Sequence, residues 1–178
     1  MDKNTTGTPS APPLLDIRGL RKTYRLPRGQ TLKAVDGVSL SVTAGETLGL
    51  VGESGCGKST LGRCMLRLTD ISAGQVSFEG RDITRLRERT LRPLRPRMQM
   101  VFQDSHASLN PRRRIGDILA EPLRVHPDAA GRRRSAAVIY DRLHELMELV
   151  GLPATALERY AHEFSGGQRQ RINIARAL

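Results

Sequence analysis

Residues 52–60 read GESGCGKST and fit the pattern G-x-x-x-x-G-K-[ST] of a phosphate-binding loop. Glycines let the backbone curl so that successive N–H groups point at an anion, and a helix beginning near Gly57 adds the positive end of its dipole. Lys58 can reach the β- and γ-phosphates, and the Ser59 hydroxyl can ligate Mg²⁺. The segment predicts a site for a nucleoside triphosphate, ATP above all, with Mg²⁺.

Every position of this loop is a candidate ligand, and Thr60 can add a hydrogen bond to an α-phosphate oxygen. A dinucleotide fingerprint is rejected, because Lys-Ser follows the last glycine directly. Composition alone would give the pattern in roughly one of two hundred such chains. The predicted ATP ligands here are Gly52, Glu53, Ser54, Gly55, Cys56, Gly57, Lys58, Ser59 and Thr60.

A second glycine-rich motif, FSGGQRQR, occupies residues 164–171 and runs into INIARAL. Ser165 can cap a helix, and Gly166 and Gly167 leave the first N–H groups uncovered for an anion. Taken alone, an ordinary capped helix is the simpler interpretation. Two phosphate-binding ends more than a hundred residues apart are unusual in one chain.

Hydrophobic patterning predicts the strands and helices that carry these motifs. Short strands are predicted at 14–18, 22–26, 38–42, 47–51, 75–78 and 98–102, and a helix at 84–92 that breaks at Pro93. Leu61, Cys64, Met65 and Leu68 recur at helical spacing after the loop. From about residue 115 the chain is predicted to be helical. There one apolar stripe, stopped by Gly151 and Pro153, consists of Ile139, Leu143, Leu146, Met147 and Val150.

The length of 178 residues predicts one domain, or one domain with a small satellite, and the net charge is +11. No apolar run approaches a membrane span, and the polar N-terminus lacks the order of a signal peptide. Cys56 and Cys64 are too far apart to pair and fit a reducing cytosol. Arginine clusters at 81–97, 112–114 and 132–134 permit nucleic-acid binding, but no aromatic residues interleave with them. Nucleic acid is therefore an unlikely partner, and proximity to an anionic membrane explains the charge better.

Together, the two motifs resemble the ATP-binding subunit of an ABC transporter. Ser165, Gly166, Gly167 and Gln168 match the family's signature motif, with Phe164 where leucine is more usual. In the family this motif completes the ATP site of a partner subunit, which implies two head-to-tail subunits around two ATP molecules. Tyr24 matches the aromatic residue that stacks on adenine. Gln103 matches the Q-loop glutamine that meets Mg²⁺ and the attacking water and senses the membrane subunit.

The segments GLVGESGCGKST (49–60) and SLNPR (108–112) are closer still to the oligopeptide and dipeptide importer branch, which includes nickel and glutathione importers. Ser105 departs from that branch, where proline is usual. The resemblance implies an ATPase at the cytoplasmic face of the bacterial inner membrane that powers solute import, with di- or oligopeptides as the favoured solute. Its partners would be an identical or different second ATPase subunit, the permease subunits and, indirectly, a solute-binding protein.

The implied fold is an α/β P-loop NTPase of the ABC ATPase type. It has a RecA-like core, an antiparallel β subdomain and a helical subdomain that carries the signature. Residues 1–13 are expected to be a disordered lead, and 14–178 a partial ATP-binding domain. Within it, the β subdomain and core take 14–104, the Q-loop exit and helical subdomain 105–164, and the signature motif and helix 165–178.

No apolar run ending in Asp-Glu follows the signature, so the Mg²⁺-binding aspartate and water-polarising glutamate of the family are not found. We therefore expect a C-terminally truncated ATPase with low stability and negligible turnover alone. Lys58 and Gln103 are the catalytic candidates, and Ser59 and Gln103 the metal ligands. Two other interpretations stay open: an inactive nucleotide-binding module, and a soluble ABC-type ATPase acting on nucleic acid.

Overall fold

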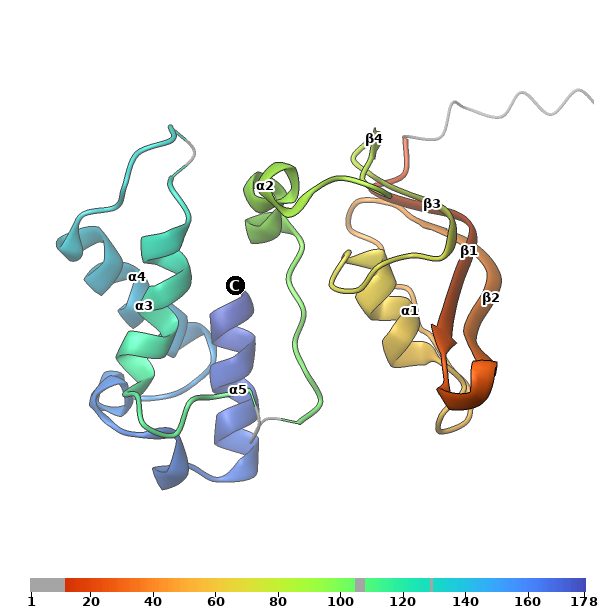
Figure 1. The fold of residues 1–178 in the computed structure, drawn as a ribbon. Helices are drawn as coiled ribbons and strands as arrows, with labels where there is room; N and C mark the ends of the chain where they lie inside the picture. Colours follow the sequence, from red (N-terminus) through yellow and green to blue (C-terminus); the bar gives the residue numbers. More distant parts are fainter. Residues whose placement is uncertain (1–11, 105–107, 129) are drawn as a thin grey trace, which may run out of the picture. The chain divides into compact units, whose positions relative to one another are not determined.

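A computed structural model describes residues 12–104, 108–128 and 130–178 (Figure 1). The chain forms two compact units, one ending at Arg92 and the other beginning at Pro93. Most of the expected disordered lead (1–13) and the departure at Ser105 lie outside the described residues. Within the part of the chain that is described, no helix is long and apolar enough to cross a bilayer.

The first unit is built on a four-stranded antiparallel sheet with the order β2-β1-β3-β4. Its strands are β1 (Leu15–Arg25), β2 (Thr31–Val42), β3 (Ala73–Phe78) and β4 (Arg81–Asp82). Ile17, Leu20 and Val76 are almost fully buried on it. The two short strands predicted at 14–18 and 22–26 form one strand, because β2 pairs along the whole of β1 and joins them.

The β1–β2 ladder is irregular beside Ala34. Lys22 pairs with Val35, whereas the next residue, Thr23, pairs with Lys33. Strand β2 therefore carries one extra residue, Ala34, opposite the Lys22–Thr23 step. Such a bulge bends the strand and re-aims its backbone groups.

Helix α1 (Lys58–Met65) packs on β1 and β2 and buries Leu61 and Cys64. The helix predicted after the loop is confirmed, but its extension to Leu68 is wrong. The chain leaves the helix after Met65, and Leu68 is exposed. Cys64 is buried, Cys56 is exposed, and both thiols are free.

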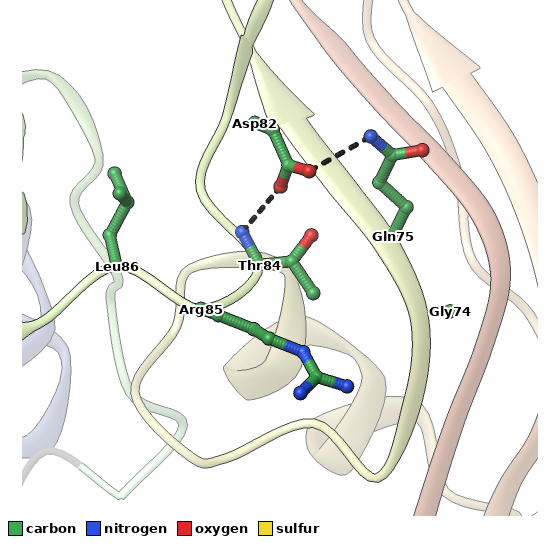
Figure 2. A pocket seen from close by; sticks show the side chains of 6 residues that line it. All are labelled: Gly74, Gln75, Asp82, Thr84, Arg85 and Leu86. Atoms are coloured by element: carbon green, nitrogen blue, oxygen red, sulfur yellow. Dashed lines mark hydrogen bonds between the residues drawn. The ribbon is translucent and has the colours of Figure 1, made fainter.

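The β3–β4 hairpin holds an open pocket of about 550 Å³ (Figure 2). The Asp82 carboxylate is its most heavily bonded group. It accepts a hydrogen bond from the Thr84 backbone N–H at 2.8 Å and one from the Gln75 amide at 2.9 Å. Hydrogen bonds from Thr84, with a smaller contribution from Gln75, hold the pKa of Asp82 below its usual value.

This lowered pKa makes the hairpin sensitive to acid. A carboxyl group whose pKa is lowered by folding stabilises the folded state above its unfolded pKa of about 3.9, and this stabilisation is lost as the pH falls through the lowered value. We expect the free energy of unfolding to fall with acidification in this range, and less so in Asp82→Asn. Urea titrations from pH 6 to pH 2 measure the slope, and equal slopes in both proteins would contradict the assignment.

The helix predicted at 84–92 is present only in part. Helix α2 (Glu88–Leu91) begins four residues late, because a turn follows the hairpin at 84–85 and Arg87, at the N-cap, is still extended with ψ 153°. It passes directly into the 3-10 segment η2 (Arg92–Arg97), since Pro93 cannot continue an α-helical ladder.

The strands predicted at 47–51 and 98–102 are not formed. Both segments run without regular secondary structure, and Val51 is 95 % and Phe102 37 % exposed. A strand is stable only when a neighbour satisfies its N–H and C=O groups. In the described part of the chain neither segment joins the β1–β4 sheet, so its apolar residues have no ladder to enter.

The second unit is a helical cluster around one core. Its elements are α3 (Ile115–Val125), α4 (Ala136–Leu149), η3 (Ala154–Glu158), η4 (Ala161–Glu163) and α5 (Gly166–Ala177). The stripe predicted on α4 is confirmed: four of its residues are buried and Val150 packs against them. Gly151, with φ 66°, ends the helix as expected.

Candidate nucleotide-binding site

The loop predicted to bind phosphates leads into α1 and touches the bulge of β2. Gly57 stands at the helix N-cap with φ 95°, a left-handed conformation that favours glycine. A Cβ at this position would lie 2.1 Å from the Ala34 carbonyl oxygen. Both the backbone angle and the close approach therefore require glycine, and the loop is seated on the strand through this contact.

Lys58 closes the loop on itself. Its ammonium donates to the carbonyl oxygens of Gly52 at 2.6 Å and Glu53 at 2.5 Å, and lies 3.6 Å from the Cys56 sulfur. The cation thus sits at the centre of the curled backbone, where the pattern places it. A bound triphosphate would offer oxygens of full negative charge in place of these carbonyls.

The start of α1 suits an anion. No side chain caps the helix at Gly57, so its first N–H groups keep their capacity to bind a ligand. Ser59 is exposed and Thr60 half-buried on the first turn. Hydroxyl oxygen is a ligand that Mg²⁺ accepts, so the residues present fit a magnesium-bound triphosphate.

Tyr24 lies in the same unit as the loop. It pairs with Leu32 across the β1–β2 ladder, two residues from the bulged Ala34 that touches Gly57. The ring is half-buried, and the Lys22 ammonium lies 4.7 Å from its centroid. The structure thereby brings the predicted base-stacking residue and the predicted phosphate loop onto one strand pair.

The second glycine-rich motif begins α5 in the other unit. Ser165 caps the helix: its hydroxyl accepts from the Gln168 N–H at 3.3 Å, and the Gln168 side chain accepts from the Ser165 N–H at 2.9 Å. Phe164 is buried, with the Arg159 guanidinium 4.6 Å from its ring centroid. This anchor leaves Ser165 to Gln168 exposed at the surface.

Among the described residues, no contact requires glycine at positions 166 and 167. Neither has a positive φ, and a Cβ on either would meet nothing within 4 Å. Glycine in a helix is less stable than alanine by roughly 0.5–1 kcal/mol, so the pair weakens α5 without an internal reason. A bare backbone at a helix start suits the close approach of something from outside the chain.

Gln103 lies in the second unit, exposed and without regular secondary structure. The structure does not place it, Ser165 or Gln168 relative to the phosphate loop, which belongs to the first unit. The assignments of these residues as nucleotide or metal ligands remain predictions.

Many arginines of the second unit hold the fold rather than project freely. Arg113 and Arg114 pair with Glu121 and Glu158, and Arg113 also donates to the Asp117 carbonyl at 3.0 Å. Other loops are tied by guanidinium-to-carbonyl bonds of Arg134, Arg159, Arg169, Arg171 and Arg176. Sequence composition could not separate this structural use of arginine from an anion-binding surface.

A family model described as ABC transporter matches residues 35–178. Among curated relatives, a putative peptide import ATP-binding protein of Brucella ovis is 51% identical over 166 residues, covering 93% of this chain and 50% of that protein. The oligopeptide transport ATP-binding protein OppF of Bacillus subtilis is also 51% identical, with 93% and 53% covered. The chain thus spans about half the length of the curated relatives that it matches.

The structural comparison agrees. A dimeric ATP-binding cassette, MJ0796, solved in a post-hydrolysis state with ADP and Pi, has a TM-score of 0.80 and 26% identity. The match covers 92% of this chain and 68% of that one. The fold class predicted from the sequence is confirmed by this likeness, although the strands at 47–51 and 98–102 are not formed.

Proposed function

The chain belongs to the ABC transporter family, and from this premise we propose that it binds and hydrolyses ATP to power solute import through a membrane permease. Di- or oligopeptides are the proposed solute, because the similar proteins of Brucella ovis and Bacillus subtilis are named for peptide import and oligopeptide transport. A peripheral position at the cytoplasmic face of the inner membrane follows from this role.

In this proposal the first unit holds one nucleotide. Tyr24 stacks on adenine, the loop backbone from Gly52 surrounds the phosphates, and Lys58 binds their β- and γ-oxygens. Mg²⁺, held by Ser59 with help from Gln103, would neutralise phosphate charge. Gln103 would also orient the attacking water and sense the permease. Because the chain spans about half the length of its curated relatives, we propose that turnover also needs the family's Mg²⁺-binding aspartate and catalytic glutamate.

The observation that carries the proposal is the open backbone at the start of α5. Gly166 and Gly167 have no internal reason to be glycine, they are exposed, and they follow a buried anchor at Phe164. We infer that the motif from Ser165 to Gln168 completes the ATP site of a second ATPase subunit, identical or different. The dimeric state of the MJ0796 cassette supports this arrangement.

Gly167→Ala separates this role from folding. Since alanine fits the helix and meets nothing, we expect the free energy of unfolding to stay equal or rise by about 0.5 kcal/mol. ATP-dependent association with a second subunit should be lost, because the methyl group blocks the approach of the partner's phosphate. Sedimentation of the chain with a second ABC ATPase subunit, in the presence and absence of ATP, measures this association. Val138→Ala, at an exposed position of α4 in the same unit, is the control for association, and unchanged association of Gly167→Ala would refute the role.

A further inference from the structure

Lys22 lies beside the ring predicted to stack on the base and pairs with a residue that lies close to the loop predicted to hold the phosphates. Its ammonium is 4.7 Å from the centroid of the Tyr24 ring. Its partner across the ladder is Val35, and a methyl group of Val35 is 4.0 Å from where a Cβ on Gly57 would stand. Since directly opposed residues share a face of a sheet, Lys22 emerges on the face that meets the loop.

The charge of Lys22 has no carboxylate partner among the described residues. The two neighbouring cations differ, because Arg21 and Lys33 pair with Asp36 at 3.3 and 3.5 Å. Lys22 is also half-buried. Burial raises the pKa of the Cys64 thiol on α1, and the charge of Lys22 partly opposes that rise, which places the ammonium near the helix that begins at the loop.

Among the described residues this half-buried cation contacts an aromatic ring and no carboxylate, so it is suited to an anionic ligand. A cation–π contact near the surface stabilises by about 0.5–1 kcal/mol, less than a charge-assisted hydrogen bond to phosphate. A base that stacks on Tyr24 would also compete with the ammonium for the ring. The nearest anionic group of a nucleotide whose base lies on Tyr24 and whose β- and γ-phosphates lie on Lys58 is the α-phosphate.

We propose that Lys22 is a further nucleotide-binding residue, whose ammonium leaves the Tyr24 ring to bind the phosphate chain at the position of the α-phosphate. This inference rests on the proposed function, since it assumes that ATP spans Tyr24 and the loop. Lys22 then adds a positive charge at the end of the triphosphate that Lys58 does not reach.

Isothermal titration of the chain with magnesium ATP and with magnesium tripolyphosphate, which has no base, tests it. Lys22→Met should weaken both ligands by about five- to tenfold, and Lys22→Arg should recover most of the loss. Tyr24→Ala should weaken ATP and leave tripolyphosphate unchanged. Lys33→Met, which removes the same charge from the neighbouring strand, should change neither, and far-UV circular dichroism checks that each variant is folded.

Each pattern of results has one meaning. If Lys22→Met weakened ATP alone, Lys22 would act only through the Tyr24 ring, and the α-phosphate contact would be wrong. If Lys22→Met left the affinity for both ligands unchanged and Lys58→Ala weakened both, the proposal would be overturned. If Lys58→Ala also had no effect, the phosphate site itself would be misassigned and the proposed function would fail with it.

Discussion

Lys58→Ala is expected to weaken ATP binding by roughly 30- to 150-fold, the equivalent of about 2–3 kcal/mol. The ammonium already lies inside the curled loop, 2.6 Å from the Gly52 carbonyl oxygen and 2.5 Å from that of Glu53. Phosphate oxygens would replace these neutral acceptors with charged ones, and alanine removes every such bond. Titration of a fluorescent ATP analogue into both proteins measures the difference.

A matched control removes a lysine elsewhere in the same unit. Lys33→Ala breaks only a surface pair with Asp36 at 3.5 Å, so ATP affinity should remain within about twofold of the unmodified chain. Because Lys58 bridges two carbonyl groups of one loop, thermal unfolding should be recorded for both variants. Loss of binding in a Lys58→Ala protein that still unfolds cooperatively identifies the lysine as a ligand. Full affinity would remove the basis of the nucleotide site.

Gly57→Ala is expected to destabilise the first unit by about 2–5 kcal/mol and to abolish nucleotide binding. Alanine is strained at φ 95°, and its Cβ would lie 2.1 Å from the Ala34 carbonyl oxygen. Since that atom belongs to the backbone of β2, no side chain can turn away to make room. The loop would have to leave the strand, and the start of α1 would move with it.

Gly55→Ala separates the effect of the left-handed backbone conformation from the effect of the steric clash with Ala34. Its φ of 83° is equally left-handed, but a Cβ there meets nothing within 4 Å. It should therefore lose only the backbone preference, about 1–2 kcal/mol. The chain has no tryptophan, so urea unfolding followed by far-UV circular dichroism is the suitable measurement. Equal losses in the two variants would mean that the contact with Ala34 does not constrain the loop.

Local chemistry explains what the sequence predicted well. The helix after the loop and the cap by Ser165 depend on residues within one turn of each other, so their patterns can be read along the chain. The α4 stripe is similar, because Leu143 and Met147 repeat at helical spacing and face one core. The end of the helix after the loop is the exception, since α1 stops at Met65 and Leu68 is exposed.

Contacts between distant segments explain what the sequence did not predict. The apolar runs at 47–51 and 98–102 have the composition of buried strands, yet a strand also depends on a neighbour that composition does not specify. The bulge at Ala34 depends on the register between two strands. The proximity of Lys22 to Tyr24 could have been predicted from the sequence, since residues two apart on a strand share a face. The position of Lys22 opposite Val35, whose methyl group lies near Gly57, depends on the pairing of β1 with β2, which the sequence does not reveal.

The extra residue in β2 also sets a rule for how this region can vary in length. The turn between β1 and β2 lies beyond Tyr24, and in the described part of the chain no hydrogen bond or ion pair joins it to the loop or to α1, so insertions there should be tolerated. Deleting Ala34 would instead make the pairing regular at the Lys22–Thr23 step and remove the carbonyl that Gly57 contacts. The contact between the loop and β2 would then move by one residue along the strand, and the distance between the Tyr24 ring and the Lys58 ammonium would change with it. Homologous genes should therefore gain and lose codons freely in the turn and almost never between the codons for Lys33 and Val35.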